Sequence, residues 1–416
     1  MELNKLHQLF LNSSGISTDT RNISADSIFF ALKGANFNGN EFAKDAISKG
    51  AKLAVIDEEQ YAINADYILV ENVLHCLHQL ASFHRSHLNC PVLGITGTNG
   101  KTTTKELINA VLAQKYDVVC TQGNLNNHIG VPLTVLSADL KTEFLIVEMG
   151  ANHQNEIKLL SEIADINYGI ITNIGKAHLE GFGSVEGVTK TKKELYDYIK
   201  KHSGTIFINK EDKLLQSIST TINKVEYLTD EHNDGSPFAS VKCFDKIITS
   251  KLIGSYNCTN IQAAISIGLY FDVSFEDIKS AIENYTPQNN RSQLESTIKG
   301  NSLIIDYYNA NPTSMIKAIE SFYSIKSAKK LFILGDMLEL GEVSIHEHQK
   351  IIDELSETQS EAILIGTEFG KCSHSFPHFT DVYEAQKWIK EKSFKDYFIL
   401  LKGSRGIKLE ELKDLL

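Results

Sequence analysis

The chain has 416 residues, of which 42% are hydrophobic and 22% are charged. This composition excludes a disordered or fibrous protein, and the length exceeds what one hydrophobic core serves, so we expect three domains. The net charge of −11 argues against a nucleic acid backbone as the main partner, because such partners are met by a basic face.

The pattern of short apolar runs in residues 1–90 predicts a small mixed α/β domain. Strands are expected at Ser27–Lys33, within Lys52–Asp57 and within Tyr67–Asn72, because each is a short apolar run. A helix is expected from about Val73 to His87. Pro91 then interrupts the pattern.

Residues 91–290 predict a parallel sheet with helices on both faces. The strand Val92–Thr96 leads into a glycine turn and an amphipathic helix, and apolar runs return at Glu143–Met149 and Tyr168–Ile174. Continuous apolar strands that alternate with amphipathic helices are typical of buried parallel strands.

The polar stretch Thr286–Asn301, which contains Pro287, predicts a boundary near residue 290. Beyond it, strands are expected at Ser302–Tyr308, Lys330–Asp336, Glu361–Gly366 and Tyr397–Gly403. Helices are expected near Ser314–Phe322, Ile345–Leu355, Val382–Lys390 and Leu409–Leu416. This alternation predicts a Rossmann-like α/β domain over residues 291–416.

The six cysteines are widely spaced and form no C-x-x-C pair, so neither a disulfide framework nor a zinc site is indicated. The start of the sequence lacks a charged segment followed by an apolar one, and no stretch approaches the ~18 apolar residues of a membrane span. We expect a cytoplasmic protein without membrane insertion.

The segment GITGTNGKTTT (Gly94–Thr104) lies between a predicted strand and a predicted helix, the context of a phosphate-binding loop. Glycines allow backbone N–H groups to turn inward, and the helix N-terminus adds a positive dipole end. Lys101 is predicted to reach the β and γ phosphates, and the Thr102 hydroxyl to bind Mg²⁺. The strict Walker pattern is not met, because Ile95 stands where its first glycine belongs.

Two further side chains follow predicted strands of the same sheet. Glu148 ends the apolar run FLIVE, and His178 follows the strand YGIITN, so both are candidates to face a metal at the carboxyl edge. The alternatives are a solvated loop acid at Glu148 and a merely hydrogen-bonded imidazole at His178.

Lys192 lies on the apolar stripe of a helix predicted from about Val185 to Lys200. The stripe has its apolar members at −7, −4, +3, +4 and +7 from this lysine: Val185, Val188, Leu195, Tyr196 and Ile199. Lys192 is therefore predicted to point inward. Since a buried unpaired ammonium is strongly disfavoured, it should be paired, neutral or modified, unless it extends to solvent.

Seven motifs in this order resemble the Mur ligase family: GTNGKTT, EMGANHQNEI, HLEGFGSVEGVTKTKKEL, GSYNCTN, DYYNANP, LGDMLELG and KGSR. The match spans nearly the whole chain. The segments Gly123–Thr134 and Tyr308–Met315 are most similar to members that join D-alanyl-D-alanine to a UDP-N-acetylmuramoyl tripeptide. The resemblance implies a three-domain fold with a central P-loop sheet, and an ATP-dependent amide ligase that works through an acyl phosphate in peptidoglycan synthesis.

The resemblance also implies residue roles around ATP and Mg²⁺. Phosphate contacts fall on the loop residues Gly97, Thr98, Asn99, Gly100, Lys101, Thr102 and Thr103. Adenine, interdomain and ribose contacts fall on Asn257, Asn260, Arg291 and Asp306. Thr102, Glu148, His178 and Lys192 match the family's metal and catalytic positions, and Lys192 matches the lysine that the family carbamylates with CO₂.

Substrate contacts implied by the resemblance are spread over all three domains. The uridine diphosphate end would meet Ser17, Thr18, Arg21 and Lys33, and the amino sugar and peptide would meet Asn124, Asn126 and Asn127. The dipeptide side would be formed by Asn309, Asn311, Lys402, Ser404 and Arg405. We expect a monomer with small-molecule substrates and no nucleic acid partner.

Three positions depart from the family pattern. Asn40 replaces a histidine, Asn155 replaces a glycine, and Ile305 stands where many relatives have an aspartate; all three lie outside the phosphate loop. A different amide ligase of the family and a nucleotide-dependent switch remain alternative functions. The sequence does not distinguish lysine from diaminopimelate as the third peptide residue.

Overall fold

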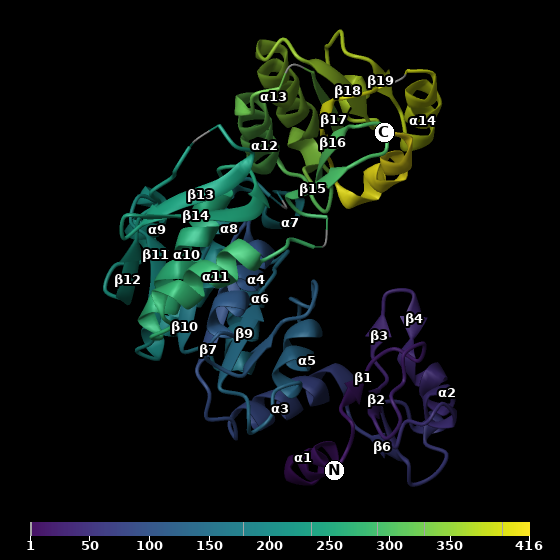
Figure 1. The fold of residues 1–416 in the computed structure, drawn as a ribbon. Coiled ribbons are helices and arrows are strands. Elements are labelled where there is room, and N and C mark those ends of the chain that lie inside the picture. The colour runs from purple at the N-terminus through teal and green to yellow at the C-terminus, as the bar shows by residue number, and fades with distance from the viewer. Residues whose placement is uncertain (1, 178, 234, 289, 328, 393) are drawn as a thin grey trace.

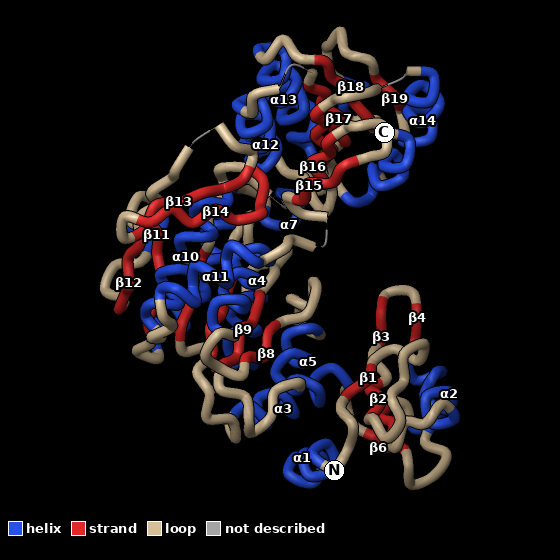
Figure 2. Tube along the Cα trace, viewed as in Figure 1, coloured by secondary structure: helices blue, strands red, loops and turns tan. Residues whose placement is uncertain are grey.

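The computed structural model describes residues 2–177, 179–233, 235–288, 290–327, 329–392 and 394–416. The chain forms three α/β units, and the central one lies between the other two (Figure 1). Figure 2 shows helices on the faces of each large sheet. In the described part of the chain, no helix combines the length and apolar character that a membrane crossing needs.

The N-terminal unit contains a parallel sheet in the order β1-β2-β5-β6 and a short hairpin, β3–β4. Its elements are α1 (Leu3–Leu11), β1 (Ile16–Ser17), β2 (Ile28–Phe30), β3 (Lys33–Gly34), β4 (Phe37–Asn38), α2 (Ala43–Ser48), β5 (Leu53–Ile56), β6 (Tyr67–Leu69) and α3 (Val73–Arg85). The strand predicted over Ser27–Lys33 is shorter, because Lys33 already belongs to the hairpin.

The central unit is built on a parallel sheet in the order β12-β11-β10-β7-β9-β8. Its sheet strands are β7 (Val92–Thr96), β8 (Val118–Cys120), β9 (Phe144–Glu148), β10 (Tyr168–Ile171), β11 (Thr205–Asn209) and β12 (Asn223–Tyr227). Its helices are α4 (Lys101–Leu112), α5 (Gly130–Leu136), α6 (Glu156–Ala164), α7 (Leu179–Phe182), α8 (Val185–Lys201), α9 (Lys213–Ile218), α10 (Asn257–Tyr270) and α11 (Phe275–Asn284). The predicted parallel sheet is confirmed.

The central unit also contains an antiparallel hairpin that the sequence patterns did not predict. Strands β13 (Phe238–Cys243) and β14 (Lys246–Ile253) pair around a two-residue turn at Phe244 and Asp245. Both turn residues have positive φ, 48° and 60°, without a glycine to mark the turn. The usual hairpin signal is therefore absent from the sequence.

The C-terminal unit has the strand order β15-β16-β20-β17-β18-β19, in which only the β15–β16 pair is antiparallel among the described strands. Its elements are β15 (Gln293–Ser296), β16 (Ser302–Asp306), α12 (Pro312–Ser324), β17 (Lys330–Gly335), α13 (Ser344–Glu357), β18 (Glu361–Ile365), β19 (His378–Phe379), α14 (Val382–Glu391) and β20 (Phe398–Lys402). The Rossmann-like alternation is confirmed.

Two predictions for this unit need correction. The polar stretch Thr286–Asn301 is not only a separator, since β15 forms an antiparallel edge strand there, and an edge strand needs little apolar sequence. The expected helix Leu409–Leu416 is a run of 3₁₀ turns over Leu409–Leu415. The buried leucines 409 and 412 are three apart, which is the 3₁₀ repeat.

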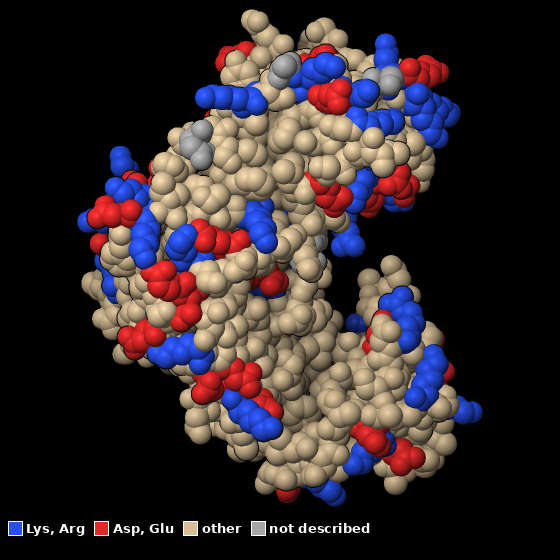
Figure 3. Space-filling model, in the orientation of Figure 1, with Lys and Arg blue, Asp and Glu red and all other residues tan. Residues whose placement is uncertain are grey.

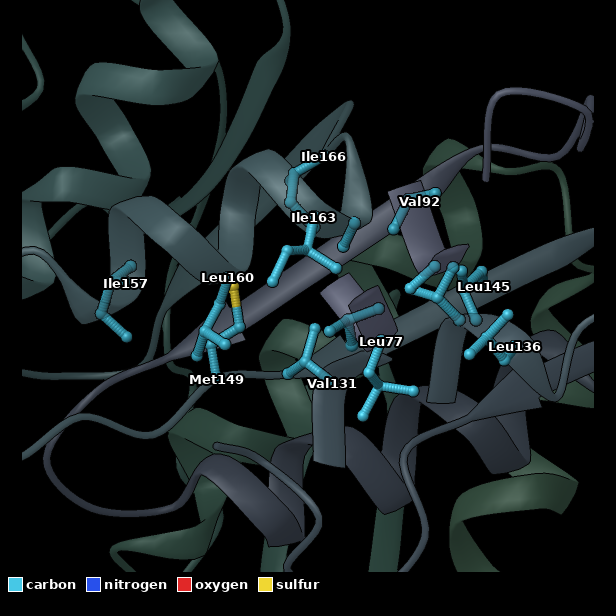
Figure 4. Packing of buried hydrophobic residues seen from close by; sticks show 14 of the residues in the cluster. Leu77, Val92, Val131, Leu136, Leu145, Met149, Ile157, Leu160, Ile163 and Ile166 are labelled. Atoms are coloured by element: carbon cyan, nitrogen blue, oxygen red, sulfur yellow. The ribbon is translucent and has the colours of Figure 1, made fainter. Parts of the chain in front are cut away.

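One continuous core joins the N-terminal unit to the central sheet. Helix α3 packs against α5 and α6, and Figure 4 shows Leu77 of α3 beside Val131 of α5, with Leu160 and Ile163 of α6 nearby. Apolar side chains buried this way stabilise by roughly 1.5–3 kcal/mol each. The N-terminal unit is thus anchored through α3, while its small sheet lies to one side (Figure 1).

Candidate active site

The predicted phosphate loop has its first residues, Gly97–Gly100, between β7 and α4, so the expected order of strand, loop and helix is confirmed. Gly97 has φ 146°, and a Cβ there would lie 2.0 Å from Thr172 Oγ1. Gly100 has φ 78°, and its Cβ would lie 2.8 Å from Asn260 Oδ1. Both positions therefore require glycine, because a larger residue would be strained and would clash.

The end of β10 holds this loop in shape. Thr172 Oγ1 and Asn173 Nδ2 donate to the carbonyl of Asn99, at 2.6 and 2.9 Å, and the Asn99 amide donates to Asn173 Oδ1 at 3.0 Å. The conformation of the loop therefore depends on residues that follow the neighbouring strand β10, and not on the loop sequence alone.

Lys101 begins α4 and folds back over the loop. Its Nζ donates to the carbonyls of Gly97 and Thr98, at 2.8 and 3.1 Å. Removal from water lowers the pKa of Lys101 to about 8, and the Glu148 carboxylate acts in the opposite direction. The ammonium thus lies at the centre of the loop, near an acid.

Glu148 ends β9 and is only 1% exposed. Its Oε1 accepts from Asn126 Nδ2 at 2.8 Å and from Thr102 Oγ1 at 3.2 Å. Its Oε2 is buried and has no hydrogen-bond partner among the residues that the structure describes. A carboxylate oxygen left open beside a threonine hydroxyl fits Mg²⁺, a cation that takes few protein ligands and keeps others from water and phosphate.

Lys192 is buried on the inward face of α8 at 3% exposure, as predicted. Its Nζ lies 5.9 Å from the centre of the Phe182 ring. Burial and, to a smaller extent, the nearby Lys101 lower the pKa of Lys192 to about 7, although the acids Glu156, Glu194 and Glu148 oppose this shift. Within the described residues no ion pair includes Lys192, so its amine is poised to lose its proton near neutral pH.

A cavity of about 450 Å³ lies between the central and C-terminal units. Predicted site residues that line it are Thr98, Asn99, Gly100, Lys101, Thr102, Thr103, Asn124, Asn126, Asn127, Glu148, Asn257, Asn260, Arg291, Asp306, Asn309 and Lys402. A neighbouring cavity of about 270 Å³ shares Thr102, Asn124 and Arg291, and also includes Arg405. The structure therefore gathers residues that lie up to 304 positions apart in the sequence.

Side chains from both units are already paired in this cavity. Asp306, at the end of β16, forms an ion pair with Lys402 of β20 at 2.6 Å. Asn260 Nδ2 donates to Asn257 Oδ1 at 2.9 Å, and Asn260 Oδ1 accepts from Thr104 Oγ1 at 3.1 Å. The α10 asparagines thus form part of the same network as the phosphate-loop helix.

Three family models match consecutive segments that together cover most of the chain. Residues 12–85 match the Mur ligase family catalytic domain, residues 95–268 the Mur ligase middle domain, and residues 290–405 the Mur ligase glutamate ligase domain. The UDP-N-acetylmuramoyl-tripeptide–D-alanyl-D-alanine ligase of Bacillus subtilis is 36% identical, over 97% of this chain and 93% of that protein. The chain belongs to the Mur ligase family.

Other relatives agree in sequence and in fold. The ligase of the same name from Haemophilus influenzae is 32% identical over 95% of this chain and 92% of its own length. The crystal structure of MurF from Acinetobacter baumannii has a TM-score of 0.84 at 27% identity, covering 96% of this chain and 93% of that one. MurF ligase from Thermotoga maritima in complex with ADP also has a TM-score of 0.84, at 26% identity, covering 96% and 97%. As a Mur ligase, this chain is an ATP-dependent ligase.

Several predicted residues of this Mur ligase do not line the large cavity. Asn311 caps α12 and exchanges side-chain hydrogen bonds with Asn99 of the phosphate loop, at 2.7 and 3.4 Å. Ser404 is 3% exposed, and its hydroxyl accepts from the Leu338 amide at 3.0 Å. Both side chains hold parts of the protein together here. His178 lies outside the described residues.

The four N-terminal candidates lie away from this cavity. Ser17 and Thr18 lie at and just beyond β1, and Arg21 pairs with Asp19 at 2.6 Å. Lys33 pairs with Asp57 at 2.8 Å and with Glu58 at 2.9 Å. Figure 3 shows a wide opening between the N-terminal and C-terminal units, with charges of both signs scattered over the visible face.

Tyr308 was not assigned a role from the sequence, although it lies inside the DYYNANP motif. The guanidinium carbon of Arg291 lies 3.8 Å from the centre of its ring, and that of Arg405 lies 5.9 Å away. Arg291 Nε is buried with no partner among the described residues. The ring therefore orients the interdomain arginine, and only its neighbours in space could have identified it.

Asn155, at the position where the family resemblance predicts glycine, precedes α6 with φ 69°. Asparagine adopts this left-handed conformation more readily than other side chains, so the departure preserves the backbone turn. Asn40 is fully buried and bonds to Asp57 through both its amide oxygen and its amide nitrogen, at 3.0 and 2.9 Å.

Proposed function

We propose that this Mur ligase joins D-alanyl-D-alanine to UDP-N-acetylmuramoyl-tripeptide, with ATP converted to ADP and phosphate, to complete a peptidoglycan precursor. The observation that carries the proposal is the cavity in which the phosphate loop, the open oxygen of Glu148 and side chains of the C-terminal unit face one another. The printed names of the relatives, at up to 36% identity, support this substrate pair.

In the proposed reaction the tripeptide carboxylate attacks the γ phosphorus of ATP, and ADP leaves. The amine of the dipeptide then attacks the acyl carbon, and phosphate leaves. The loop amides, the N-terminus of α4 and Lys101 would hold the phosphates and offset their charge. Arg291, oriented by Tyr308, would approach the same phosphates from the interdomain side.

Thr102 and Glu148 would hold Mg²⁺, with His178 and Lys192 contributing to a second metal position. A bound Mg²⁺ neutralises charge that develops on the transferred phosphoryl group. The chain's own part is to hold the Glu148 carboxylate in a fixed orientation, through Asn126 and the hydroxyl of Thr102. Among the described residues, no group of three or more His, Cys, Asp or Glu side chains is arranged to hold a metal ion. In this proposal the nucleotide and water would supply the remaining Mg²⁺ ligands.

Lys192 would carry a carbamate. Its pKa of about 7 supports this, because a neutral amine is needed to attack CO₂, after which the nitrogen loses a proton. The product is an anion, which removes the repulsion between the Lys192 ammonium and Lys101. A buried cation becomes an oxygen ligand at a metal position.

We propose three domains, over residues 1–90, 91–290 and 291–416. Ser17, Thr18, Arg21 and Lys33 would bind the uridine diphosphate end, while Asn124, Asn126 and Asn127 meet the sugar and peptide. Asn309, Lys402 and Arg405 would line the dipeptide side, with Asn311 and Ser404 shaping it from behind. All six cysteines are free, which supports a cytoplasmic enzyme, and we propose that it acts as a monomer.

The decisive experiment is a product assay with purified protein, ATP and Mg²⁺. UDP-muramoyl tripeptides that contain lysine or diaminopimelate are tested in separate reactions, each with D-alanyl-D-alanine. The masses of the products are measured by mass spectrometry. We expect phosphate release that requires both peptide substrates and a mass increase equal to the dipeptide less water. Phosphate release driven by a single amino acid, with the dipeptide inert, would assign another ligase activity of the family.

A further inference from the structure

A second buried lysine, Lys105, lies one turn beyond Lys101 in α4 and has no place in the proposed chemistry. It is 0% exposed and does not line either cavity described above. Its ammonium forms an ion pair with Glu106 at 3.0 Å and donates a short hydrogen bond to the carbonyl of Thr121. Burial of an ammonium is costly, so this arrangement calls for a reason.

Thr121 lies where the chain leaves β8, the edge strand of the central sheet. Its amide donates to the carbonyl of Ile146 at 3.0 Å, and its hydroxyl accepts from the amide of Glu148 at 3.0 Å. Thr121, which accepts the hydrogen bond from Lys105, is therefore also bonded to the backbone of Glu148. A displacement of Thr121 would also move Glu148.

The segment that follows, Gly123–Asn127, carries the proposed substrate asparagines. Asn126 Nδ2 donates to Glu148 Oε1 at 2.8 Å, and the Asn126 carbonyl accepts from the Gly150 amide at 2.7 Å. A Cβ at Gly150 would lie only 2.8 Å from Asn126 Oδ1, so the segment fits tightly against the end of β9. Its start is fixed at Thr121 and its middle at Glu148.

We propose that Lys105 is a positioning residue that fixes the asparagine segment to the phosphate-loop helix, so that the phosphate, metal and peptide subsites keep one geometry. The inference rests on the proposed function for its kinetic consequence, but not for its structural one. Helix α4 carries Lys101 and Thr102 at its start and Lys105 one turn later, so a single rigid element reaches both sides of the site.

The test compares Lys105→Met, which removes the charge at similar length, with two matched controls in the full-length protein. Glu106→Gln removes only the ion pair. Lys115→Met removes a lysine just beyond the same helix, whose ammonium also bonds to backbone carbonyls, those of Phe271 and Asp272, but which lines neither cavity. Amide hydrogen exchange over residues 122–127 and the KM values for both substrates are measured.

For Lys105→Met we expect exchange in residues 122–127 to accelerate at least ~10-fold, because a hydrogen bond to a charged group is lost. The KM for the muramoyl tripeptide should rise ~10-fold, while the KM for ATP and the affinity for ADP change less than ~3-fold. Both control variants should match the wild type. Unchanged exchange in residues 122–127, or an equal rise in both KM values, would overturn the proposal.

Lys105→Gln covers the case in which Lys105→Met does not fold, since its amide still offers a donor to the Thr121 carbonyl. Intermediate exchange in this variant supports the positioning role. Failure of both variants to fold, while both controls fold, would assign Lys105 to general stability instead. Hydrogen exchange needs no catalysis, so a wild type that does not condense these substrates would refute the proposed function without deciding this inference.

Discussion

Two buried acids at the carboxyl edges of two parallel sheets have opposite surroundings. Glu148 ends β9 in the central sheet, and Asp336 follows β17 in the C-terminal sheet; they are 1% and 2% exposed. Among the described residues, the Glu148 carboxylate accepts hydrogen bonds from two side chains through one oxygen, and its other oxygen has no partner. Asp336 accepts from the backbone amides of Glu368 and Phe369, at 2.8 and 2.9 Å, one on each oxygen.

Glu148 therefore has an oxygen available to a ligand, whereas Asp336 holds the loop that contains Glu368 and Phe369. Backbone donors already engage both oxygens of Asp336, and a cation would have to compete with these hydrogen bonds. Desolvation also raises the pKa of Asp336, whereas its backbone hydrogen bonds oppose that shift. Position at a strand end is therefore insufficient to identify a metal ligand, and the partners decide.

The largest effect is expected at Lys101, which distinguishes the central edge from the C-terminal one. Lys101→Ala removes the cation from the phosphate loop, so kcat should fall at least ~1000-fold, as for a lost transition-state charge contact. The measurement is phosphate release together with oxygen isotope exchange into the tripeptide carboxylate. Persistence of that exchange would contradict the role of Lys101 in acyl phosphate formation.

A paired substitution tests the two acids directly. Glu148→Gln should lower activity ~100-fold or more and raise the Mg²⁺ concentration required, with thermal stability nearly unchanged. Asp336→Asn should instead lower the free energy of unfolding by about 1–3 kcal/mol, because one backbone amide loses its acceptor. Denaturant titrations and Mg²⁺ titrations of both variants decide, and a reversed pattern would refute the comparison.

Lys192 gives a pH-dependent prediction for the central edge. Its folded-state pKa of about 7 lies below its ordinary 10.5, so between these values the unfolded chain binds the proton and the folded chain does not. Unmodified Lys192 therefore makes stability rise with pH over this window and lowers it at lower pH. In CO₂-depleted buffer, bicarbonate should restore activity with a midpoint near pH 7.

The control for that experiment is Lys200→Ala, an exposed lysine of the same helix, which should behave as the wild type. Lys192→Ala should be inactive and insensitive to bicarbonate. An active Lys192→Ala variant, together with a wild type that ignores CO₂, would eliminate the carbamate.

The smallest change in stability and activity is expected at Asn99 and Asn311, whose side chains join the predicted phosphate loop of the central unit to α12 of the C-terminal unit. Asn311→Ser keeps a side-chain cap for α12 but loses the amide pair with Asn99, so stability should change by less than ~0.5 kcal/mol. Asn311→Ala loses both and should cost about 1 kcal/mol. If the amide pair links the phosphate loop to the C-terminal unit, the KM for ATP rises ~3-fold in both variants.

Local patterns in the sequence were sufficient for several strands and for the strand–loop–helix context of the predicted phosphate loop. The strands around residues 92–96, 144–148 and 302–306 follow from uninterrupted apolar runs, and the inward direction of Lys192 follows from helical spacing alone. Patterns failed where no local signal exists. The β13–β14 turn has no glycine, and β15 is a polar edge strand whose pairing partner decides its conformation.

By itself, the sequence determined the strands with continuous apolar runs, the glycines at residues 97 and 100 between a strand and a helix, and the candidate side chains for a nucleotide site. Only the tertiary structure decided which of those side chains are available, because hydrogen-bond partners come from distant segments. It left Glu148 Oε2 open, closed both oxygens of Asp336, and turned Asn311 toward Asn99. Residue type sets what a group can bind, and packing sets what it still has free to bind with.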